Sequence, residues 1–319
     1  MPREYIYEVS RLRALEGGLL TTRRLFEAAE AENEEEAMQI FKEAGYDTGL
    51  ELDKMLAKRK NELLSELDFD ENICPEIGVV LTVNDIYNIK TALKGLISGQ
   101  KPDRLYAFPT SLDLSCLFDD IRDGNTDRLP LKYAETAKKG YDIILETADG
   151  KALEQFLDRA ALGLLREEAE KCDSKMLKEY VESFTAVCDF KIALRIAKCR
   201  LNEAEALKAV CGSDGLPASV IARAAGEGTE EVISLMEGSL LRDGAPLAKK
   251  GIRHFEKWAN GMLLDIIKGA KLEAFGPDPL VAYFFACEAE IKAVRTVAVC
   301  KRAGIDPAGI KERLGELYV

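Results

Sequence analysis

A short helical pattern recurs three times in this chain at one fixed interval. Segments 88–90, 189–191 and 290–292 read Asn-Ile-Lys, Asp-Phe-Lys and Glu-Ile-Lys, and their spacing is constant (189 − 88 = 101 and 290 − 189 = 101). A fixed period indicates related structural units, and repeated helical units commonly build surfaces that bind other proteins. The recurrence therefore predicts related helical units and a surface for protein partners.

Apolar residues follow a helical period through each of these segments. In the last one they step by three and four residues, at Leu280, Phe284, Cys287, Ile291, Val294 and Ala298. This spacing places the apolar side chains on one face of a helix. Longer, more charged helices, each with one apolar seam, are expected at 50–67, 151–171 and 252–272. Only 78–83 has the character of a strand, and a lone strand has nothing to pair with, so we predict an all-α protein.

Several helix ends can be assigned from capping residues. Asp278 is expected to cap a helix that Pro279 opens, and Gly304 is expected to end it. Asp306 and the following proline predict a final helix that runs close to Val319. The acidic, Ala-rich stretch 27–36 is expected to be a solvated helix face, with a docking site for a basic partner as the alternative.

The period also suggests how the chain divides into domains. We expect helical repeats over 1–80, 81–180 and 181–275, followed by closing helices over 276–319. Short clusters of Gly, Pro, Asp and Ser, such as 99–109 and 212–217, are expected to link the helices.

Composition excludes several classes of partner. A chain of 319 residues with 47% hydrophobic content can bury a sizeable core. The formal net charge of −12 argues against nucleic acids and against bare acidic lipid, both of which attract basic proteins. The apolar helix 279–302 is interrupted by charges, and 1–16 lacks a secretory signal, so neither membrane insertion nor export is expected. The eight cysteines never form a CxxC pair and indicate reduced core residues of a cytosolic protein.

Candidate catalytic residues do not assemble into a site. Asp119, Asp120 and Asp123 resemble the aspartate-rich run with which helical prenyl-diphosphate enzymes hold magnesium, but no second motif accompanies them. His254 is the only histidine, so a multi-histidine metal site is excluded. We therefore expect no catalytic residue, no metal and no cofactor. A Mg-dependent isoprenoid-type enzyme and a generic helical-repeat scaffold remain the alternative functions.

The recurring lysines are the remaining candidates for function. Each lies at the edge of an apolar stripe, where a lysine buries its stem and keeps its ammonium group wet or paired. Lys90, Lys191 and Lys292 either keep three helix faces soluble or meet acidic groups of a partner as equivalent charges.

Three segments carry a resemblance to a known family. The run DPLVAYFFACEAEIKAVRTVAVCKRAGIDPAGIKERLGELYV within 276–319 resembles the end of the C subunit of the bacterial and archaeal V/A-type rotary ATPases, whose eukaryotic relative is the d subunit of the V-type ATPase. NIKTALKG at 88–95 and YEVSRLRALE at 7–16 extend the likeness across most of the chain.

The resemblance implies an all-helical, funnel-like protein of three similar domains around a pseudo-threefold axis. It implies a non-catalytic central-stalk subunit that couples the rotor shaft subunits to the membrane ring subunits and transmits torque for proton or sodium transport. Such a protein is peripheral, on the cytoplasmic face of the membrane. The candidate partner-binding residues are then the cations of the recurring helices: Lys90, Lys94, Lys191, Arg195, Lys292 and Arg295.

Overall fold

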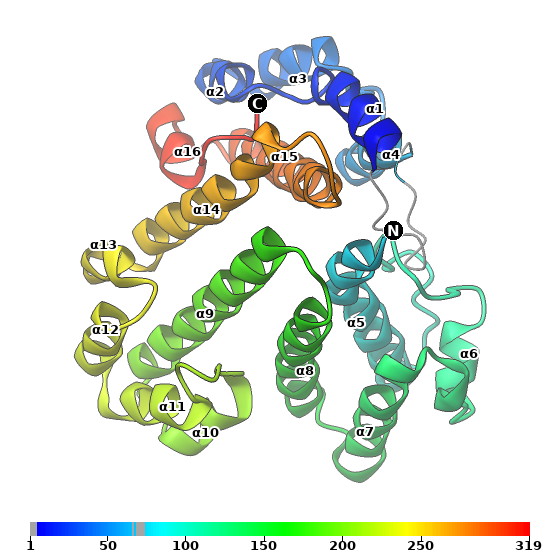
Figure 1. Cartoon of the computed structure of the whole chain (residues 1–319), viewed down its shortest axis with the longest axis vertical. Coiled ribbons are helices and arrows are strands. Elements are labelled where there is room, and N and C mark those ends of the chain that lie inside the picture. Colours follow the sequence, from blue (N-terminus) through cyan, green and yellow to red (C-terminus); the bar gives the residue numbers. More distant parts are fainter. Residues whose placement is uncertain (1–4, 66, 68–73) are drawn as a thin grey trace. The chain divides into compact units, whose positions relative to one another are not determined.

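The structure is a computed structural model that describes residues 5–65, 67 and 74–319. Over these residues the chain forms sixteen α-helices and three short 3₁₀ helices, without a strand (Figure 1). The all-α prediction is confirmed, and 78–83 lies inside the helix Pro75–Ser98. Three related repeats around a common axis stay a prediction.

The described chain divides into two compact units. Of the described residues, unit 1 contains 5–65, 67, 174–180 and 246–319, and unit 2 contains 74–173 and 181–245. The helices of unit 1 are α1 (Ile6–Glu16), α2 (Thr22–Glu30), α3 (Glu34–Glu43), α4 (Leu52–Leu64), α13 (Ala245–Lys250), α14 (Ile252–Lys268), η3 (Gly269–Leu272), α15 (Asp278–Arg302) and α16 (Pro307–Arg313). Those of unit 2 are α5 (Pro75–Ser98), α6 (Leu117–Arg122), η1 (Thr126–Arg128), α7 (Leu131–Thr147), α8 (Gly150–Glu170), α10 (Glu203–Ala209), α11 (Ala218–Glu227), α12 (Thr229–Glu237) and η2 (Arg242–Gly244). The first residues of α9 (Lys175–Lys198) belong to unit 1 and the rest to unit 2.

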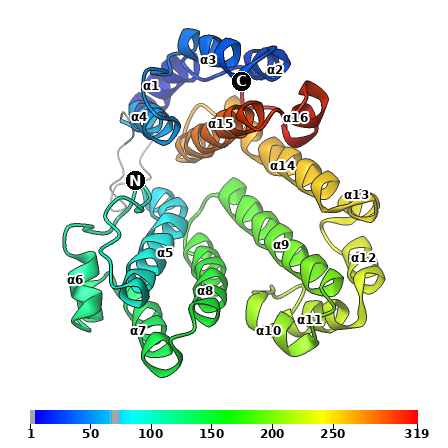
Figure 2. The same cartoon turned by 180° about the vertical axis from the view of Figure 1, so that it is seen from behind.

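Unit 1 is built around α15, the long apolar helix near the end of the chain. Helices from both ends of the sequence, α2, α3, α4 and α16, pack around it (Figures 1 and 2). The backbone N–H of Thr22 donates to the carbonyl of Val319 at 2.9 Å, and the N–H of Leu317 donates to the Thr22 hydroxyl at 2.9 Å. The first and last segments of the chain therefore complete one core.

The acidic stretch 27–36 meets basic side chains of the same unit. It is divided between α2 and α3, and Arg302 of α15 donates to Glu34 at 2.7 Å. Lys311 of α16 pairs with Glu30, and Lys301 donates to the carbonyl of Ala31. A single solvated face is therefore the wrong description: the stretch carries a bend and binds the C-terminal helices.

Unit 2 contains a second core, formed in part by α5, α6, α7 and α8. Leu93 of α5 and Leu157 of α8 are fully buried in it, and α8 packs along α5 in both views of the ribbon (Figures 1 and 2). Gly140 lets α7 approach closely, since a Cβ atom there would lie 2.8 Å from Leu93 Cδ1. The charged helix expected at 151–171 is thus a packed element, because its apolar seam faces this core.

Some helix ends differ from the prediction. Asp306 caps α16, since its carboxylate accepts the N–H of Gly309 at 2.8 Å, as expected. Asp278 instead lies inside α15 after Pro277, is buried and makes no cap hydrogen bond. The last helix ends at Arg313 and does not approach Val319, because the extended segment beyond it is buried in unit 1.

The eight cysteines all lie in the described part of the chain, and none of them forms a disulfide bond. Across residues 5–65, 67 and 74–319, no helix has both the length and the apolar character that a membrane span requires.

Candidate protein-interaction surface

The three recurring segments lie in three long helices, α5, α9 and α15, which we call the signature helices. They contain 24, 24 and 25 residues. The first residue of each recurring triplet is polar yet almost completely buried: Asn88 is 0% exposed, Asp189 1% and Glu290 1%. Buried polar groups of this kind need hydrogen-bond partners, since desolvation otherwise destabilises the fold.

Each of these three side chains binds the backbone N–H of a distant segment. Asn88 Oδ1 accepts the N–H of Ala107 at 2.7 Å, and its amide nitrogen donates to the carbonyl of the same residue at 3.0 Å. The carboxylate of Asp189 accepts the N–H of Cys211 at 2.8 Å and that of Gly212 at 2.7 Å. The period of 101 residues therefore repeats a contact as well as a sequence.

The third contact joins α15 to the N-terminal part of unit 1. Glu290 Oε2 accepts the N–H of Leu20 at 2.7 Å, and its other oxygen accepts the hydroxyl of Tyr46 at 2.7 Å. Arg59 Nε lies 3.8 Å from the same carboxylate. Burial raises the pKa of Glu290 and of Asp189 above the usual carboxyl range, although the hydrogen bonds they accept oppose this shift.

These buried anchors were missed in the sequence, where only the lysine of each triplet was considered. A signal for them was present, because Asn88 lies three residues after Asp85 and four before Ala92, in phase with the buried face of α5. A polar residue that recurs on an apolar face indicates a buried contact. Asp85 is itself such an anchor: it accepts the Ser111 N–H at 2.9 Å and the Tyr133 hydroxyl at 2.8 Å.

The cations of α5 pair with carboxylates of the adjacent helix α8. Lys90 Nζ lies 2.5 Å from Asp158 Oδ1, and Lys94 Nζ lies 2.5 Å from Glu154 Oε1. The Lys90 side chain is only 18% exposed, and its ammonium group also lies 5.8 Å from the ring centre of Tyr87. Both lysines therefore bridge two helices of unit 2.

The other four predicted residues lie in different surroundings. Arg295 on α15 pairs with Asp53 of α4 at 2.5 Å, and Lys191 on α9 is half-buried. Arg195 and Lys292 are exposed, and no ion pair joins either of them to another described residue. The structure therefore places four of the six cations in unit 2 and two in unit 1, and only Arg195 and Lys292 are both exposed and uncommitted.

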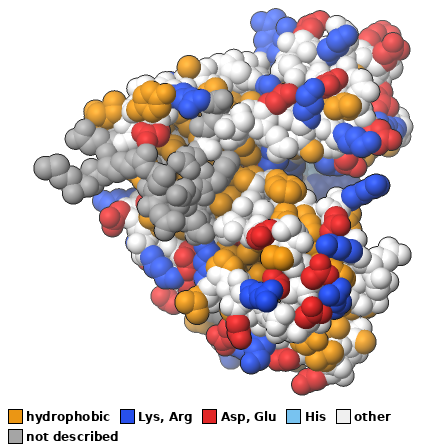
Figure 3. Space-filling view, turned by 90° about the vertical axis from the view of Figure 1, so that its right-hand side faces the viewer, with side chains coloured by type: hydrophobic (Ala, Val, Ile, Leu, Met, Phe, Trp, Pro, Cys, Tyr) orange, Lys and Arg blue, Asp and Glu red, His pale blue; other side chains and the backbone are white. Residues whose placement is uncertain are grey.

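Surface charge is mixed on the face drawn in Figure 3. Acidic and basic side chains are interspersed there, with apolar side chains between them. Such a surface favours specific pairing with a partner over attraction to a uniformly charged polymer.

The aspartates in α6 and at its C-terminal end are paired with arginines. Arg128 donates to the buried Asp120 at 2.7 Å, while Arg122 donates to Asp119 at 2.8 Å and to Asp123 at 2.9 Å. Across the described part of the chain, no group of three His, Cys, Asp or Glu side chains is arranged to hold a metal ion. His254 is exposed on α14. The side chains proposed for diphosphate chemistry thus stabilise a surface turn.

Comparison with known proteins identifies the family. The model of the ATP synthase (C/AC39) subunit family matches residues 9–313. The chain therefore belongs to this family, as the resemblance in its sequence implied.

Two curated relatives are similar over most of their length. The C subunit of the V-type sodium ATPase of Enterococcus hirae is 23% identical over 252 residues, which cover 76% of this chain and 76% of the relative. The C subunit of the A-type ATP synthase of Haloferax volcanii is 26% identical over 290 residues, which cover 82% of this chain and 79% of the relative. Similarity thus extends to subunits of both a sodium ATPase and an ATP synthase.

Proposed function

We propose that this chain is the non-catalytic central-stalk subunit of a V/A-type rotary ATPase, where it couples the soluble rotor shaft to the membrane ring of ion-carrying subunits. Family membership over residues 9–313 is the observation that carries the proposal. In this role the protein lies at the cytoplasmic face of the membrane and transmits torque without performing chemistry.

The internal construction of the signature helices supports a mechanical role. Each helix is fastened to a distant segment through a buried polar side chain, at Asn88, Asp189 and Glu290. Close-packed interiors deform little, and satisfied buried hydrogen bonds fix their geometry further. A subunit that passes torque between two partners needs this resistance to deformation.

The available cations define the proposed contact with the partners. Lys90, Lys94 and Arg295 already form ion pairs with carboxylates of their own unit. A partner's acidic groups would have to compete with those carboxylates for the three cations. Arg195 and Lys292 can meet acidic groups of the shaft or ring without that competition. Charged pairs across an interface add specificity and association rate.

Charge reversal tests this assignment. The wild-type chain and the variant Arg195→Glu/Lys292→Glu are mixed with the purified shaft and ring subunits, and the complexes are weighed by native mass spectrometry. We expect the wild type to form a complex and the variant to bind at least tenfold more weakly, because each reversed charge places like charges together.

Arg223→Glu is the control, since Arg223 is an exposed cation on α11 and does not belong to a signature helix. It should bind as the wild type does. Equal binding by the double variant would refute the roles of Arg195 and Lys292. Absence of any complex with the wild-type chain would refute the coupling function itself.

A further inference from the structure

Unit 1 carries a cluster of exposed cations where α13 is followed by α14 (Figure 1). Its members, which we call the basic patch, are Lys249, Lys250, Arg253 and Lys257, and all four are exposed. Glu256 is the only acidic residue among 249–257, so these nine residues carry a charge of +3 (four cations minus one acid, with histidine neutral), while the rest of the chain carries −15 (−12 − 3). The basic patch is therefore a local reversal of the overall charge.

The packing of α14 holds two of these cations at a fixed spacing. Phe255 and Ala259 of this helix are 0% and 1% exposed, so its inner face is anchored in unit 1. Arg253 and Lys257 are exposed and four residues apart, which places them on the outer face, about 6 Å apart along the helix axis. The basic patch thus presents charges at a defined separation on a packed helix.

Three cations of the basic patch lack the acidic partners that other exposed cations of unit 1 have. No ion pair joins Lys250, Arg253 or Lys257 to another described residue, and Lys257 donates to the carbonyl of Lys311 at 3.0 Å. Ion pairs elsewhere in the unit join exposed cations to carboxylates: Arg24 to Glu43, Lys58 to Asp47, Arg295 to Asp53, Arg302 to Glu34 and Lys311 to Glu30. Like charges four residues apart destabilise a helix, so an acidic group that binds Arg253 and Lys257 would remove this repulsion.

The charge distribution favours a short acidic protein segment over an extended polyanion. Exposed charges interact over roughly 8 Å at physiological salt, so only groups close to the basic patch experience its positive charge. A membrane surface or a nucleic acid would also meet the negative remainder of the chain, whereas a short segment would not. Ile252, which lies between Lys250 and Arg253 in the sequence, is 37% exposed and offers the apolar contact that protein interfaces combine with a charged rim.

We propose that the basic patch binds a short acidic segment of a neighbouring subunit, with carboxylates paired to Arg253 and Lys257 and an apolar side chain packed on Ile252. The assignment of the segment to a subunit rests on the function proposed above. It adds to that function a contact on α13 and α14, which are not signature helices. Two separate contacts resist rotation between subunits better than one, since a single contact allows the joint to pivot.

A titration of the full chain with an acidic peptide tests the basic patch directly. The probe is fluorescein-labelled hexaglutamate, and the neutral control is hexaglutamine with the same label. Fluorescence anisotropy follows the binding of each peptide as the chain is added. We expect hexaglutamate alone to bind, and we expect its affinity to fall as the salt concentration rises, because the contacts join exposed charges.

Two double variants show whether the peptide binds at the basic patch. Lys250→Glu/Arg253→Glu reverses two of its cations and should weaken hexaglutamate binding at least tenfold. Lys42→Glu/Lys54→Glu is the matched control, since it changes the net charge by the same amount at exposed cations of α3 and α4, and it should bind the peptide as the wild type does. All four positions are exposed, so circular dichroism should show the same thermal unfolding for both variants.

Several results would overturn the proposal. These are the absence of hexaglutamate binding, equal binding of hexaglutamine, and equal affinities of the two double variants. Sedimentation with vesicles of phosphatidylcholine and phosphatidylserine in equal parts should leave the chain in solution; binding that Lys250→Glu/Arg253→Glu abolishes would assign the patch to a membrane instead. In native mass spectrometry this variant should join the shaft and ring subunits at least tenfold more weakly than the wild type, and equal assembly would exclude a neighbouring subunit as the occupant. Failure of the wild type to assemble counts against the coupling function, while the peptide titration still decides whether the patch binds an acidic segment.

Discussion

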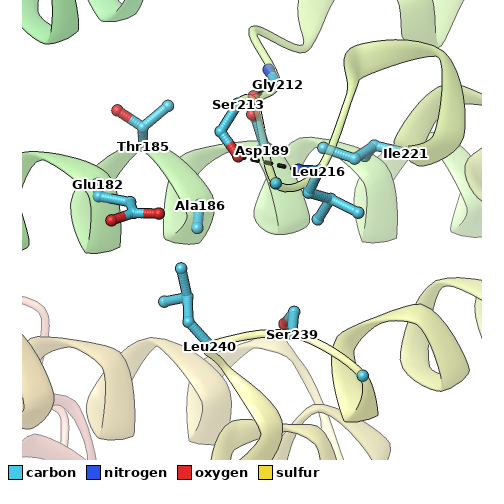
Figure 4. Close-up of a pocket in the computed structure, with 12 residues that line it drawn as sticks. Glu182, Thr185, Ala186, Asp189, Gly212, Ser213, Leu216, Ile221, Ser239 and Leu240 are labelled. Atoms are coloured by element: carbon cyan, nitrogen blue, oxygen red, sulfur yellow. Dashed lines mark hydrogen bonds between the residues drawn. The ribbon is translucent and has the colours of Figure 1, made fainter.

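The carboxylate of Asp189 accepts a hydrogen bond from the backbone N–H of Gly212 at 2.7 Å, and the two residues are 23 positions apart in the chain. Gly212 has a φ angle of 74°, and a Cβ atom there would lie 2.3 Å from the backbone nitrogen of Ala218. Glycine is therefore required both by the conformation and by the close approach. Asp189 and Gly212 together fix the position of the segment that precedes α11 (Figure 4).

Replacing Asp189 with asparagine should loosen this segment. The amide offers one acceptor, and its NH₂ group would face a backbone donor, so one buried N–H loses its partner at a cost of about 1–3 kcal/mol. We expect hydrogen exchange at the Cys211 and Gly212 amides to accelerate roughly tenfold or more. Asp214→Asn, an exposed position in the same loop, is the control and should leave both rates unchanged. Equal protection in Asp189→Asn and the wild type would contradict the anchoring role.

Two glycines in neighbouring helices of unit 2 should respond in opposite ways to alanine. At Gly140 the new methyl group would lie 2.8 Å from Cδ1 of the fully buried Leu93, and overpacking of this kind costs about 1–3 kcal/mol. A Cβ atom at Gly163 would meet nothing within 4 Å beyond the backbone of its own helix, so alanine should raise stability by about 0.5–1 kcal/mol. Urea unfolding followed by circular dichroism measures both. A stabilised Gly140→Ala variant would show that α5 and α7 are packed less closely than described.

The ion pair between Lys94 and Glu154 should contribute little to the free energy of unfolding, and its contribution should depend on salt concentration. Its hydrogen bond holds the pKa of Glu154 below its usual value, so the contribution is present at neutral pH and is lost as pH falls through the acid range. Both side chains are nearly half exposed, and such pairs contribute about 0.2–1 kcal/mol. A double-mutant cycle with Lys94→Ala and Glu154→Ala should give a coupling in this range that falls in 1 M NaCl. A larger coupling, insensitive to salt, would indicate a buried pair.

Glu290 should make unit 1 less stable as pH rises. Its folded-state pKa is raised above the ordinary value of 4.5, mainly by burial, so the folded chain retains the proton longer than the unfolded chain does. The resulting stability is fully present below that ordinary value and is lost as pH rises through the folded pKa. Tyr46 and Cys287 lie beside the group, and burial raises the pKa of both above their ordinary values, so both keep their protons near neutral pH.

Thermal unfolding of the wild type and of Glu290→Gln between pH 4 and pH 8 measures this effect. Glutamine does not ionise, so the stability of the Glu290→Gln variant should fall less over this pH range than that of the wild type. Glu288→Gln is the control on the same helix, and it should retain the pH dependence of the wild type. Parallel curves for the wild type and Glu290→Gln would contradict the prediction.

The helical class and most helix positions could be predicted from periodicity. The stripe from Leu280 to Ala298 lies in α15, and the cap at Asp306 was identified from one residue and the proline after it. These features depend on residues three or four positions apart, so a short stretch of sequence is enough to recognise them. The end of α16 at Arg313 could not be predicted in this way, because it depends on burial against Thr22 at the other end of the chain.

The candidate site shows the same division between local and distant contacts. The period located the signature helices, but it could not show that Lys90 and Arg295 are paired with Asp158 and Asp53, since those carboxylates are remote in sequence. The phase of Asn88 with the buried face of α5 could indicate its burial, but the sequence could not identify its partner, because Ala107 contributes only backbone atoms. A backbone partner leaves no residue type in the sequence by which to find it.

The contact between Leu20 and Glu290 spans 270 residues and imposes an order on folding during synthesis. At about 5–20 residues per second, a ribosome needs roughly 15–50 s to make the chain that separates them. Throughout that interval α2, α3 and α4 lack the helix that buries their apolar faces, and the whole of unit 2 is made before that helix appears. The core that the N-terminal helices share with α15 is therefore completed only after nearly the whole chain has been synthesised.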